Sequence, residues 1–406
     1  MSVEKKVPEI RFKRFVREWE NLTLGDLGSV AMNKRIFKHQ TTIAGDVPFF
    51  KIGTFGKQPD AFISKALFNE YKAKYPYPVA GDLLLSASGS IGRVVEYKGE
   101  EHYFQDSNIV WLKHDGKINN SFLKVFYSMV KWSGLEGSTI QRLYNKNILD
   151  TEISTPERQE QIAIGNYFQK LDTLINQHQQ KHDKLSSIKK AMLKKMFPKQ
   201  GETIPEIRFK GFRGEWVENN LGELIDIRSA ARVHKEQWTE AGVPFFRTSD
   251  VVSIYKRQEN TKAYISHDVY HGLSEKIGKV TKDDLLITGG GSIGIPYLVP
   301  NDNPLYFKDA DLLWLKNNKK FNGYFLYTFF FSAFFKQHIK SISHTGTIAH
   351  YTIEQAKVTP INTCSHEEQT QIGNYFQKLD ALINQHQQQI TKLNNIKQAC
   401  LSKMFV

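Results

Sequence analysis

The sequence predicts an α+β protein made of two tandem copies of one unit, in which a globular α/β module is followed by a long helix. First, residues 164–197 and 372–405 match at 25 of 34 positions without a gap. Second, apolar residues recur in steps of four and three along both stretches, which is typical of helices that pair. Third, the residues that precede each stretch share further landmarks.

Each of the two matched stretches contains no proline and a single glycine close to its start, so we expect one uninterrupted helix from each. At 1.5 Å per residue, such a helix extends about 50 Å. A narrow apolar stripe needs a partner, and the other copy is the best match, so we predict that the two helices pair. The predicted seam residues are Ile164, Phe168, Leu171, Ile175, Leu185, Ile372, Phe376, Leu379, Ile383, Ile390 and Leu393.

Histidines also occupy seam positions, at His178, His182 and His386. Polar seam residues commonly fix the register of paired helices, and we interpret the histidines in this way. Metal binding is the alternative interpretation.

The repeat extends through the globular modules. The paired landmarks are PEIRFK at 8–13 and 205–210, VPFF at 47–50 and 243–246, DLLLSASGSIG at 82–92 and DLLITGGGSIG at 284–294, and WLK at 111–113 and 314–316. We therefore predict a module at 1–155, a helix at 156–200, a second module at 201–363 and a second helix at 364–406.

Turn signals separate short β-rich runs within each module. We expect strands near 47–52, 82–86 and 108–113, and helices near 61–75 and 121–132. Trp111 and its counterpart Trp314 are predicted to lie in the cores.

Capping residues precede both long helices. Thr155 is expected to cap the first helix, with Pro156 at its first helical position, and Ser365 with Glu368 forms a capping-box pattern for the second. The most apolar run, at 325–335, has about half the length of a membrane span, so we interpret it as a buried helix.

The net charge of +13 suggests a polyanionic partner. The segments 1–156 and 157–200 each carry +5, whereas 201–363 carries only +2, so a nucleic-acid surface in the second module requires local segregation of charge. Two cysteines form neither a disulfide framework nor a zinc motif, and the opening residues lack the apolar core of a secretory leader. We therefore expect a cytoplasmic protein that does not associate with membranes.

Residues Gly289–Gly294 match the G-x-G-x-x-G pattern of dinucleotide-binding loops. That pattern requires a following helix, but Ile295-Pro296 indicates a strand, and the first module lacks the first glycine. We interpret the loop as a structural turn. Close approach of its backbone to a DNA phosphate is the alternative.

Pro59-Asp60 with Glu70 and Lys72 superficially resembles the carboxylate–lysine set of a metal-dependent nuclease. The second module has no counterpart, so a turn followed by a charged helix face is the simpler interpretation. The chain also lacks the Asp/Asn-Pro-Pro-Tyr/Phe motif of amino-methyltransferases.

Candidate DNA-binding residues are basic or lie in the glycine loops, because lysine and arginine bind phosphates and arginine also binds base edges. The alternative for each basic residue is solvated surface charge. The candidates are Lys34, Arg35, Lys38, Ser90, Arg93 and Arg142 in the first module and Arg228, Arg232, Arg247, Lys256, Arg257 and Ser292 in the second.

The chain resembles the specificity (S) subunits of type I restriction-modification systems over essentially its whole length. The resemblance rests on the doubled PEIRF opening, on the Gly-Ser-Ile-Gly loop, and on the start of each helix. That start contains Gln161, Phe168 and Leu171-Asp172 in the first copy and Gln369, Gln371 and Leu379-Asp380 in the second. His182, at the position of Ile390, makes the first seam more polar.

The resemblance implies a non-catalytic protein with two target recognition domains, each of which reads one half of a split DNA sequence. It also implies an antiparallel coiled coil that sets the spacing of the half-sites. Methyltransferase (M) subunits, two in number, and restriction (R) subunits would be the partners. S-adenosylmethionine, ATP and Mg²⁺ are expected in those partners, and no cofactor in this chain. A stand-alone DNA-binding regulator of the same architecture is the alternative.

Overall fold

The computed structural model describes residues 7–134, 141–343 and 350–405. The chain forms two compact units, of which unit 1 comprises Met1–His178 with Gln389–Val406 and unit 2 comprises Gln179–Gln388. The segments predicted from sequence kept each long helix, at 156–200 and 364–406, apart from the modules. The contacts instead divide both helices, so that each unit contains one module and part of each helix.

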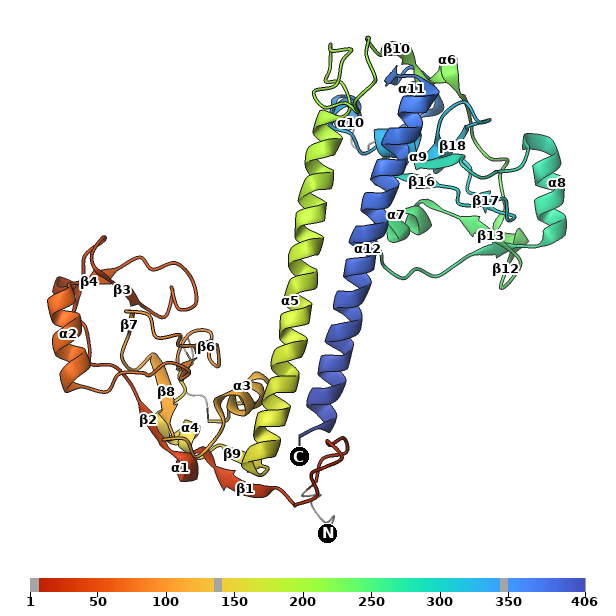
Figure 1. Ribbon diagram of the computed structural model, residues 1–406. Helices are drawn as coiled ribbons and strands as arrows, with labels where there is room; N and C mark the ends of the chain where they lie inside the picture. Colours follow the sequence, from red (N-terminus) through yellow and green to blue (C-terminus); the bar gives the residue numbers. More distant parts are fainter. Residues whose placement is uncertain (1–6, 135–140, 344–349, 406) are drawn as a thin grey trace. The chain divides into compact units, whose positions relative to one another are not determined.

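The module of unit 1 alternates short strands and helices (Figure 1). Its elements are β1 (Glu20–Thr23), α1 (Leu24–Leu27), β2 (Ser29–Ala31), the 3-10 helix η1 (Lys38–Gln40), β3 (Val47–Phe50), β4 (Phe62–Ile63), α2 (Lys65–Lys74), β5 (Leu83–Ser86), β6 (Val94–Glu96), β7 (Tyr103–Phe104), β8 (Ile109–Lys113), α3 (Asn120–Met129), α4 (Asn145–Leu149) and β9 (Glu152–Thr155).

Three small sheets organise this module. An antiparallel four-stranded sheet has the order β2-β8-β5-β6, and β5 at its centre is buried on both faces, which explains its continuous apolar run. A second sheet, β4-β3-β7, contains the parallel pair β3–β7. The antiparallel pair β1–β9 joins the start of the module to its end.

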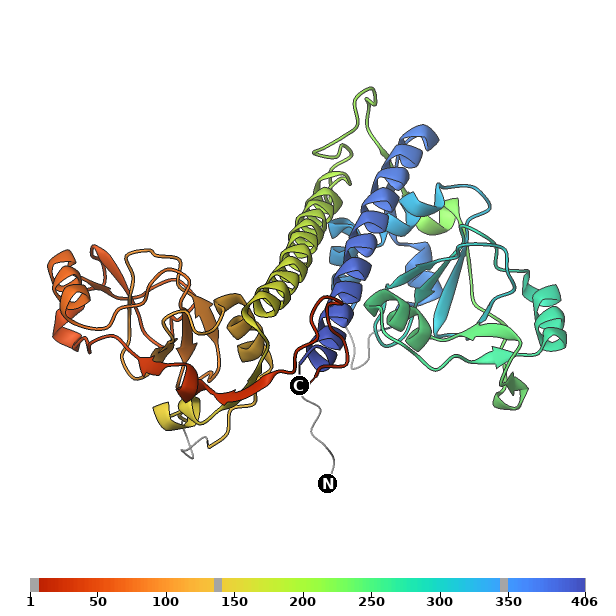
Figure 2. The same cartoon turned by 60° about the horizontal axis from the view of Figure 1, so that its bottom comes forward.

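The module of unit 2 has the corresponding sheets β11-β18-β15-β16, β12-β14-β13-β17 and β10-β19, of which the second contains one additional strand, β12. Its strands are β10 (Val217–Asn220), β11 (Asp226–Arg228), β12 (Trp238–Thr239), β13 (Val243–Phe246), β14 (Tyr264–Ile265), β15 (Leu285–Thr288), β16 (Pro296–Leu298), β17 (Tyr306–Phe307), β18 (Leu312–Lys316) and β19 (Pro360–Thr363). Its helices are α6 (Leu221–Leu224), η2 (Lys235–Gln237), α7 (Thr248–Lys256), α8 (His267–Ile277), α9 (Gly323–Phe329), α10 (Ala333–Ser343) and α11 (Ile353–Lys357). Within each unit, α2 or α8 lies at the end of the module remote from the long helices (Figures 1 and 2).

The predicted interior elements agree with the structure in type and place. The expected helices at 61–75 and 121–132 are α2 and α3, shorter by a few residues, and both tryptophans, Trp111 and Trp314, are buried. The apolar run at 325–335 is largely buried as predicted, but it spans the break between α9 and α10 and so forms two helices. Within the described residues, no helix is both long and apolar enough to cross a membrane.

The predicted cap at Thr155 is wrong. Thr155 is the last residue of β9, and its hydroxyl donates to the Glu20 carbonyl across the β1–β9 pair. That pairing keeps the backbone extended, and the first long helix begins only at Arg158. Ser365 does cap the second helix, since its hydroxyl accepts from the Glu368 amide at 3.3 Å, whereas the Glu368 carboxylate binds an arginine.

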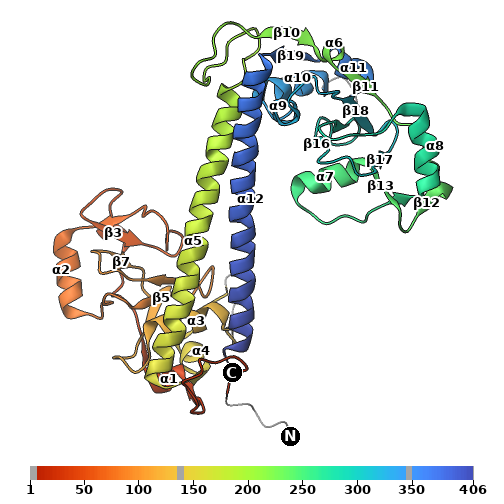
Figure 3. The ribbon, with the colours of Figure 1, turned by 45° about the vertical axis from the view of Figure 1, so that its right-hand side comes forward.

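The two long helices, α5 (Arg158–Lys195) and α12 (His366–Lys403), each contain 38 residues and pair antiparallel (Figure 3). In unit 1, Asp172 of α5 pairs with Lys397 of α12 at 2.6 Å. In unit 2, Lys189 of α5 pairs with Asp380 of α12. In unit 1, Tyr167 also contacts Cys400, so the residue number along α12 falls as that along α5 rises, which defines the antiparallel direction.

All predicted seam residues are buried or half-buried. Ile164, Phe168 and Leu171 lie in the core of unit 1, and Ile372, Phe376 and Leu379 lie in the core of unit 2. The first turns of each helix therefore pack against their own module as well as against the other helix.

The PEIRF motifs fasten both ends of the helix pair. In unit 1, Arg11 forms two hydrogen bonds, of 2.7 and 2.6 Å, with the buried carboxylate of Glu160, and the Ile10 amide donates to the carbonyl of Lys403. In unit 2, Arg208 binds Glu368 in the same way, and the Ile207 amide donates to the carbonyl of Lys195. Each motif thus joins the start of one long helix to the end of the other.

Leu171→Asp is predicted to lower the free energy of unfolding by about 3 kcal/mol or more, because it places a carboxylate in an apolar core. Asn166→Asp, on an exposed face of the same helix, is the control and is expected to change stability little. Chemical denaturation of both variants measures the difference, and equal stability would contradict the packing of the seam.

A circular permutant is predicted to fold. In unit 2, residues 198–204 connect the end of α5 to the PEIRF motif, and in unit 1 the same contacts form without a covalent link. Joining residue 405 to residue 8 through a copy of 198–204, with new termini between 200 and 201, should keep the unfolding temperature within a few degrees of the parent. Loss of cooperative unfolding would show that the two ends are not equivalent.

Candidate nucleic-acid interface

In each unit, one edge of the four-stranded sheet gathers the loops that carry most of the candidate residues. Because the strands are antiparallel, β2 and β5 end where β8 and β6 begin. The loops 32–37, 87–93 and 105–108 therefore lie together in unit 1, and 229–234, 289–295 and 308–311 lie together in unit 2. We call this place the loop edge of each unit.

Hydrogen bonds and an ion pair join the loops of unit 1 to one another. The Ser88 hydroxyl donates to the Asn108 side chain at 2.6 Å, and Arg35 pairs with Asp106 at 2.8 Å. The guanidinium of Arg93 donates to the Phe55 carbonyl at 2.9 Å. These contacts hold the loop edge in one arrangement, with Ser88 buried and Lys34, Arg35 and Arg93 exposed.

A buried tyrosine holds the first loop in both units. The Tyr103 hydroxyl donates to the backbone carbonyl of Lys34, and the Tyr306 hydroxyl donates to that of Ala231, both at 3.0 Å. Burial raises the pKa of Tyr103 and raises the pKa of Tyr306 to about 12. Both hydroxyls therefore remain protonated donors at neutral pH.

The glycine loop is locked by the last side chain of the preceding strand. The Ser86 hydroxyl donates to the Ser90 carbonyl and accepts from the Arg93 amide, and Thr288 makes the same pair of bonds to Ser292 and Ile295. A strand, β16, follows the loop of unit 2, so the loop is a turn between two strands and lacks the helix that the dinucleotide motif requires, while its approach to a DNA phosphate stays a prediction. Ser90 and Ser292 are exposed at the two loop tips.

A further residue lies beside each glycine loop. Arg142 forms an isolated antiparallel bridge with Ser88, and His350 forms the equivalent bridge with Gly290. The next residue anchors each segment, since Leu143 and Tyr351 are buried and their amides donate to loop carbonyls at 2.8 Å. His350 was not among the residues predicted from sequence, because no local pattern places it beside a loop that lies some sixty residues earlier.

The structure brings eight candidates to the loop edges. They are Lys34, Arg35, Ser90, Arg93 and Arg142 in unit 1 and Arg228, Arg232 and Ser292 in unit 2. Lys38 is exposed in η1, directly after the first loop. Among the described residues, Lys34, Arg93 and Arg142 have no carboxylate within salt-bridge distance, whereas Asp226 pairs with Arg228 at 2.5 Å. The loop edge of unit 1 therefore carries more unpaired positive charge than the loop edge of unit 2.

Three of the predicted DNA-binding residues, Arg247, Lys256 and Arg257, do not belong to the loops of the loop edge. Arg247 is partly buried and binds Asp250 through two nitrogens, at 2.9 and 3.2 Å, so its charge is already neutralised. Lys256 ends α7, and Arg257 caps that helix in the left-handed conformation, with φ of 56°. A role for these three in DNA binding stays a prediction from sequence.

The nuclease-like set does not assemble. Asp60 pairs with Lys51 at 2.9 Å, Glu70 pairs with Lys74 at 3.1 Å, and the Lys72 ammonium lies over the rings of Phe68 and Tyr77. In the part of the chain that the structure describes, no three or more His, Cys, Asp or Glu side chains gather as a possible metal site. The interpretation of 59–72 as a turn and a charged helix face is therefore the one that the geometry supports.

Comparison with known proteins places this arrangement in a family. A putative type I restriction enzyme specificity subunit of Haemophilus influenzae is 55% identical over 156 residues, which cover 38% of this chain and 40% of that protein. The MjaVIII specificity subunit of Methanocaldococcus jannaschii is 22% identical over 269 residues, or 65% of this chain and 61% of that protein. The chain thus matches less than two thirds of the length of either relative.

The fold is also that of a solved structure. The type I restriction-modification S subunit from M. genitalium superposes with a TM-score of 0.62 at 17% identity, over 98% of this chain and 99% of that one. The family described as the type I restriction modification DNA specificity domain matches residues 16–187 and 213–395, one match for each repeat. With both repeats matched, the chain belongs to the type I restriction modification DNA specificity domain family.

Proposed function

We propose that the chain is the specificity subunit of a type I restriction-modification complex and that each module reads one half of a bipartite DNA target. The proposal rests on one observation: the two loop edges share the same backbone contacts but carry different side chains at equivalent positions. Equivalent positions on the two loop edges hold Lys34 and Ala231, Arg93 and Ile295, and Arg142 and His350. Similar frames that present different side chains suit the recognition of two different half-sites.

DNA recognition needs two kinds of contact, and the loop edges offer groups for both. Lysine and arginine bind phosphates and fix the position of the protein, whereas bidentate arginine bonds to base edges provide sequence information. Lys34 and Lys38 suit the first task. Arg93 and Arg142 suit either, because a guanidinium presents its donors in a planar fork.

In this proposal the chain itself is not an enzyme and acts in the cytoplasm. Methyltransferase and restriction subunits supply the chemistry, together with S-adenosylmethionine, ATP and Mg²⁺, and the paired long helices serve as their scaffold and as the ruler between half-sites. A stand-alone DNA-binding regulator is the second candidate function. Copurification separates the two, since a specificity subunit retains a methyltransferase subunit and a regulator does not.

A module exchange tests the proposal. We predict that replacing residues 201–363 with the module of another specificity subunit changes only one half-site of the methylated sequence, because the frame of the first module is unaltered. Mapping methylated bases in cells that express the exchanged chain with its methyltransferase provides the measurement. A change in both half-sites, or no methylation with either chain, would contradict the proposal.

Charge removal tests the loop edge. Lys34→Gln, Arg93→Gln and Arg142→Gln are each predicted to weaken DNA binding and to reduce the slope of log K against log salt by about one where the side chain contacts a phosphate. Lys74→Gln, on α2 and paired with Glu70, is the matched control and should leave the slope unchanged. Binding isotherms at several salt concentrations give the slopes. Equal slopes for all four variants would place the DNA elsewhere.

A further inference from the structure

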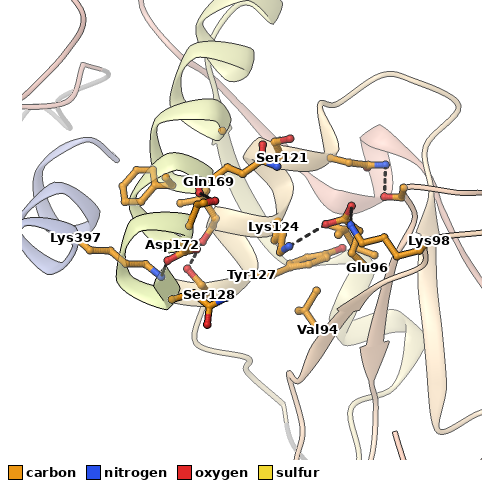
Figure 4. Close-up of a pocket in the computed structure, with 18 of the residues that line it drawn as sticks. Val94, Glu96, Lys98, Ser121, Lys124, Tyr127, Ser128, Gln169, Asp172 and Lys397 are labelled. Atoms are coloured by element: carbon orange, nitrogen blue, oxygen red, sulfur yellow. Dashed lines mark hydrogen bonds and ion pairs between the residues drawn. The ribbon is translucent and has the colours of Figure 1, made fainter. Parts of the chain in front are cut away.

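A groove in unit 1 lies between the module and α5. Its volume is about 940 Å³, and β6 and α3 line it on one side and α5 on the other, with one lysine from α12 (Figure 4). Glu96 pairs there with Lys124 at 2.9 Å, and Asp172 pairs with Lys397 at 2.6 Å. Phe168 forms part of its apolar wall.

The repeat identifies the same place in unit 2. Asn119 and Asn322 cap α3 and α9 in the same way, and their backbone amides donate to Gln161 and Gln369, which are themselves equivalent residues. Counting from these caps, the groove residues Ser121, Lys124 and Ser128 correspond to Tyr324, Tyr327 and Phe331.

In unit 2, aromatic side chains of the chain itself occupy this place. The Tyr324 hydroxyl donates to Asp380 at 2.7 Å, and Lys189, the partner of Asp380, lies over the ring of Phe331 at 5.7 Å. The rings of Tyr327 and Phe331 pack edge to face at 5.0 Å. Burial raises the pKa of Tyr324, which therefore remains a donor.

The corresponding ion pair of unit 1, Asp172–Lys397, has no tyrosine in the position of Tyr324, where Ser121 stands instead. The side chain of Asp172 is 53% exposed, whereas that of its counterpart Asp380 is 25% exposed. The two lysines, Lys397 and Lys189, are almost equally exposed, at 24% and 23%. The difference therefore lies at the aspartate, whose counterpart in unit 2 is bonded to Tyr324.

We propose that this groove binds a tyrosine-bearing segment of the methyltransferase subunit, which takes the place that Tyr324, Tyr327 and Phe331 fill in unit 2. The inference rests on the proposed function, which supplies the partner. Unit 2 shows the complementary group, a phenol hydroxyl that donates to the aspartate of an Asp–Lys pair. Both carboxylates of the groove, Glu96 and Asp172, are already paired with lysines, and the groups that fill the equivalent place in unit 2 are protein side chains, so we assign the groove to a protein segment.

Among the described residues, the groove is open in unit 1, whereas Tyr324, Tyr327 and Phe331 fill the equivalent place in unit 2. If two methyltransferase subunits bind one scaffold, they bind it unequally, and the one at unit 1 gains the groove. Filling the groove should therefore weaken one of the two binding events and spare the other.

The triple variant Ser121→Tyr, Lys124→Tyr, Ser128→Phe fills the groove with the side chains of unit 2. Titration with the purified methyltransferase subunit should show the affinity of one binding event reduced about tenfold or more. Asn69→Tyr, which adds one aromatic ring on the exposed face of α2, is the control and should bind as the parent does. Unchanged affinities in the triple variant would overturn the inference.

A second measurement does not depend on the folding of that variant. A photoreactive phenylalanine analogue placed singly at Ser128 should crosslink to a tyrosine-containing peptide of the methyltransferase subunit, whereas the same group at Asn69 should not. Crosslinking only to DNA, or to neither partner, would overturn the groove assignment. A parent chain that retains no methyltransferase subunit at all would instead contradict the proposed function.

Discussion

Neither long helix can bury its apolar stripe within its own repeat, and the rest of the structure depends on this constraint. Leu401 of α12 and Met404, directly after it, lie in the core of unit 1, and Met196 and Phe197, directly after α5, lie in the core of unit 2. Phe405 stacks on Phe122 at 5.5 Å, just as Phe197 stacks on Phe325 at 5.6 Å in unit 2. Each core is therefore built from both repeats. Within each unit, residues at the end of the other repeat's long helix complete the core.

The ion pairs Arg11–Glu160 and Arg208–Glu368 add a geometric constraint to this apolar packing. Glu160 and Glu368 are fully buried, and a buried carboxylate without its partner is costly, by about 3–5 kcal/mol when a buried pair is broken. The bond to Glu160 raises the pKa of Arg11, so the guanidinium stays charged. Because each bidentate bond accepts only one geometry, it fixes where the PEIRF segment lies against the start of the long helix. Apolar packing alone would leave that position less strictly defined.

Elements that depend on local sequence pattern were predicted correctly. Features that depend on pairing between strands distant in the sequence were not. Heptad spacing predicts α5 and α12, and the repeated landmarks predict two equal modules. The cap at Thr155 failed because pairing with β1, more than a hundred residues away, keeps that residue extended. Convergence of Lys34, Arg93 and Arg142 depends on sheet order, which spacing does not give. The partner of Arg247 was predictable, since Asp250 lies three residues later on a helix.

The contacts that hold the loop edges reach mainly the backbone, and this explains how one frame can carry different tips. Tyr103 binds the carbonyl of residue 34, Ser86 binds the carbonyl of residue 90, and the Leu143 amide binds the carbonyl of residue 87. None of these bonds requires a particular side chain at the residue that it positions. The side chain at position 34 or 142 can therefore change, as it does at 231 and 350, without loss of the loop conformation. Because the backbone bonds stabilise the loop, the exposed side chains can differ between the two modules.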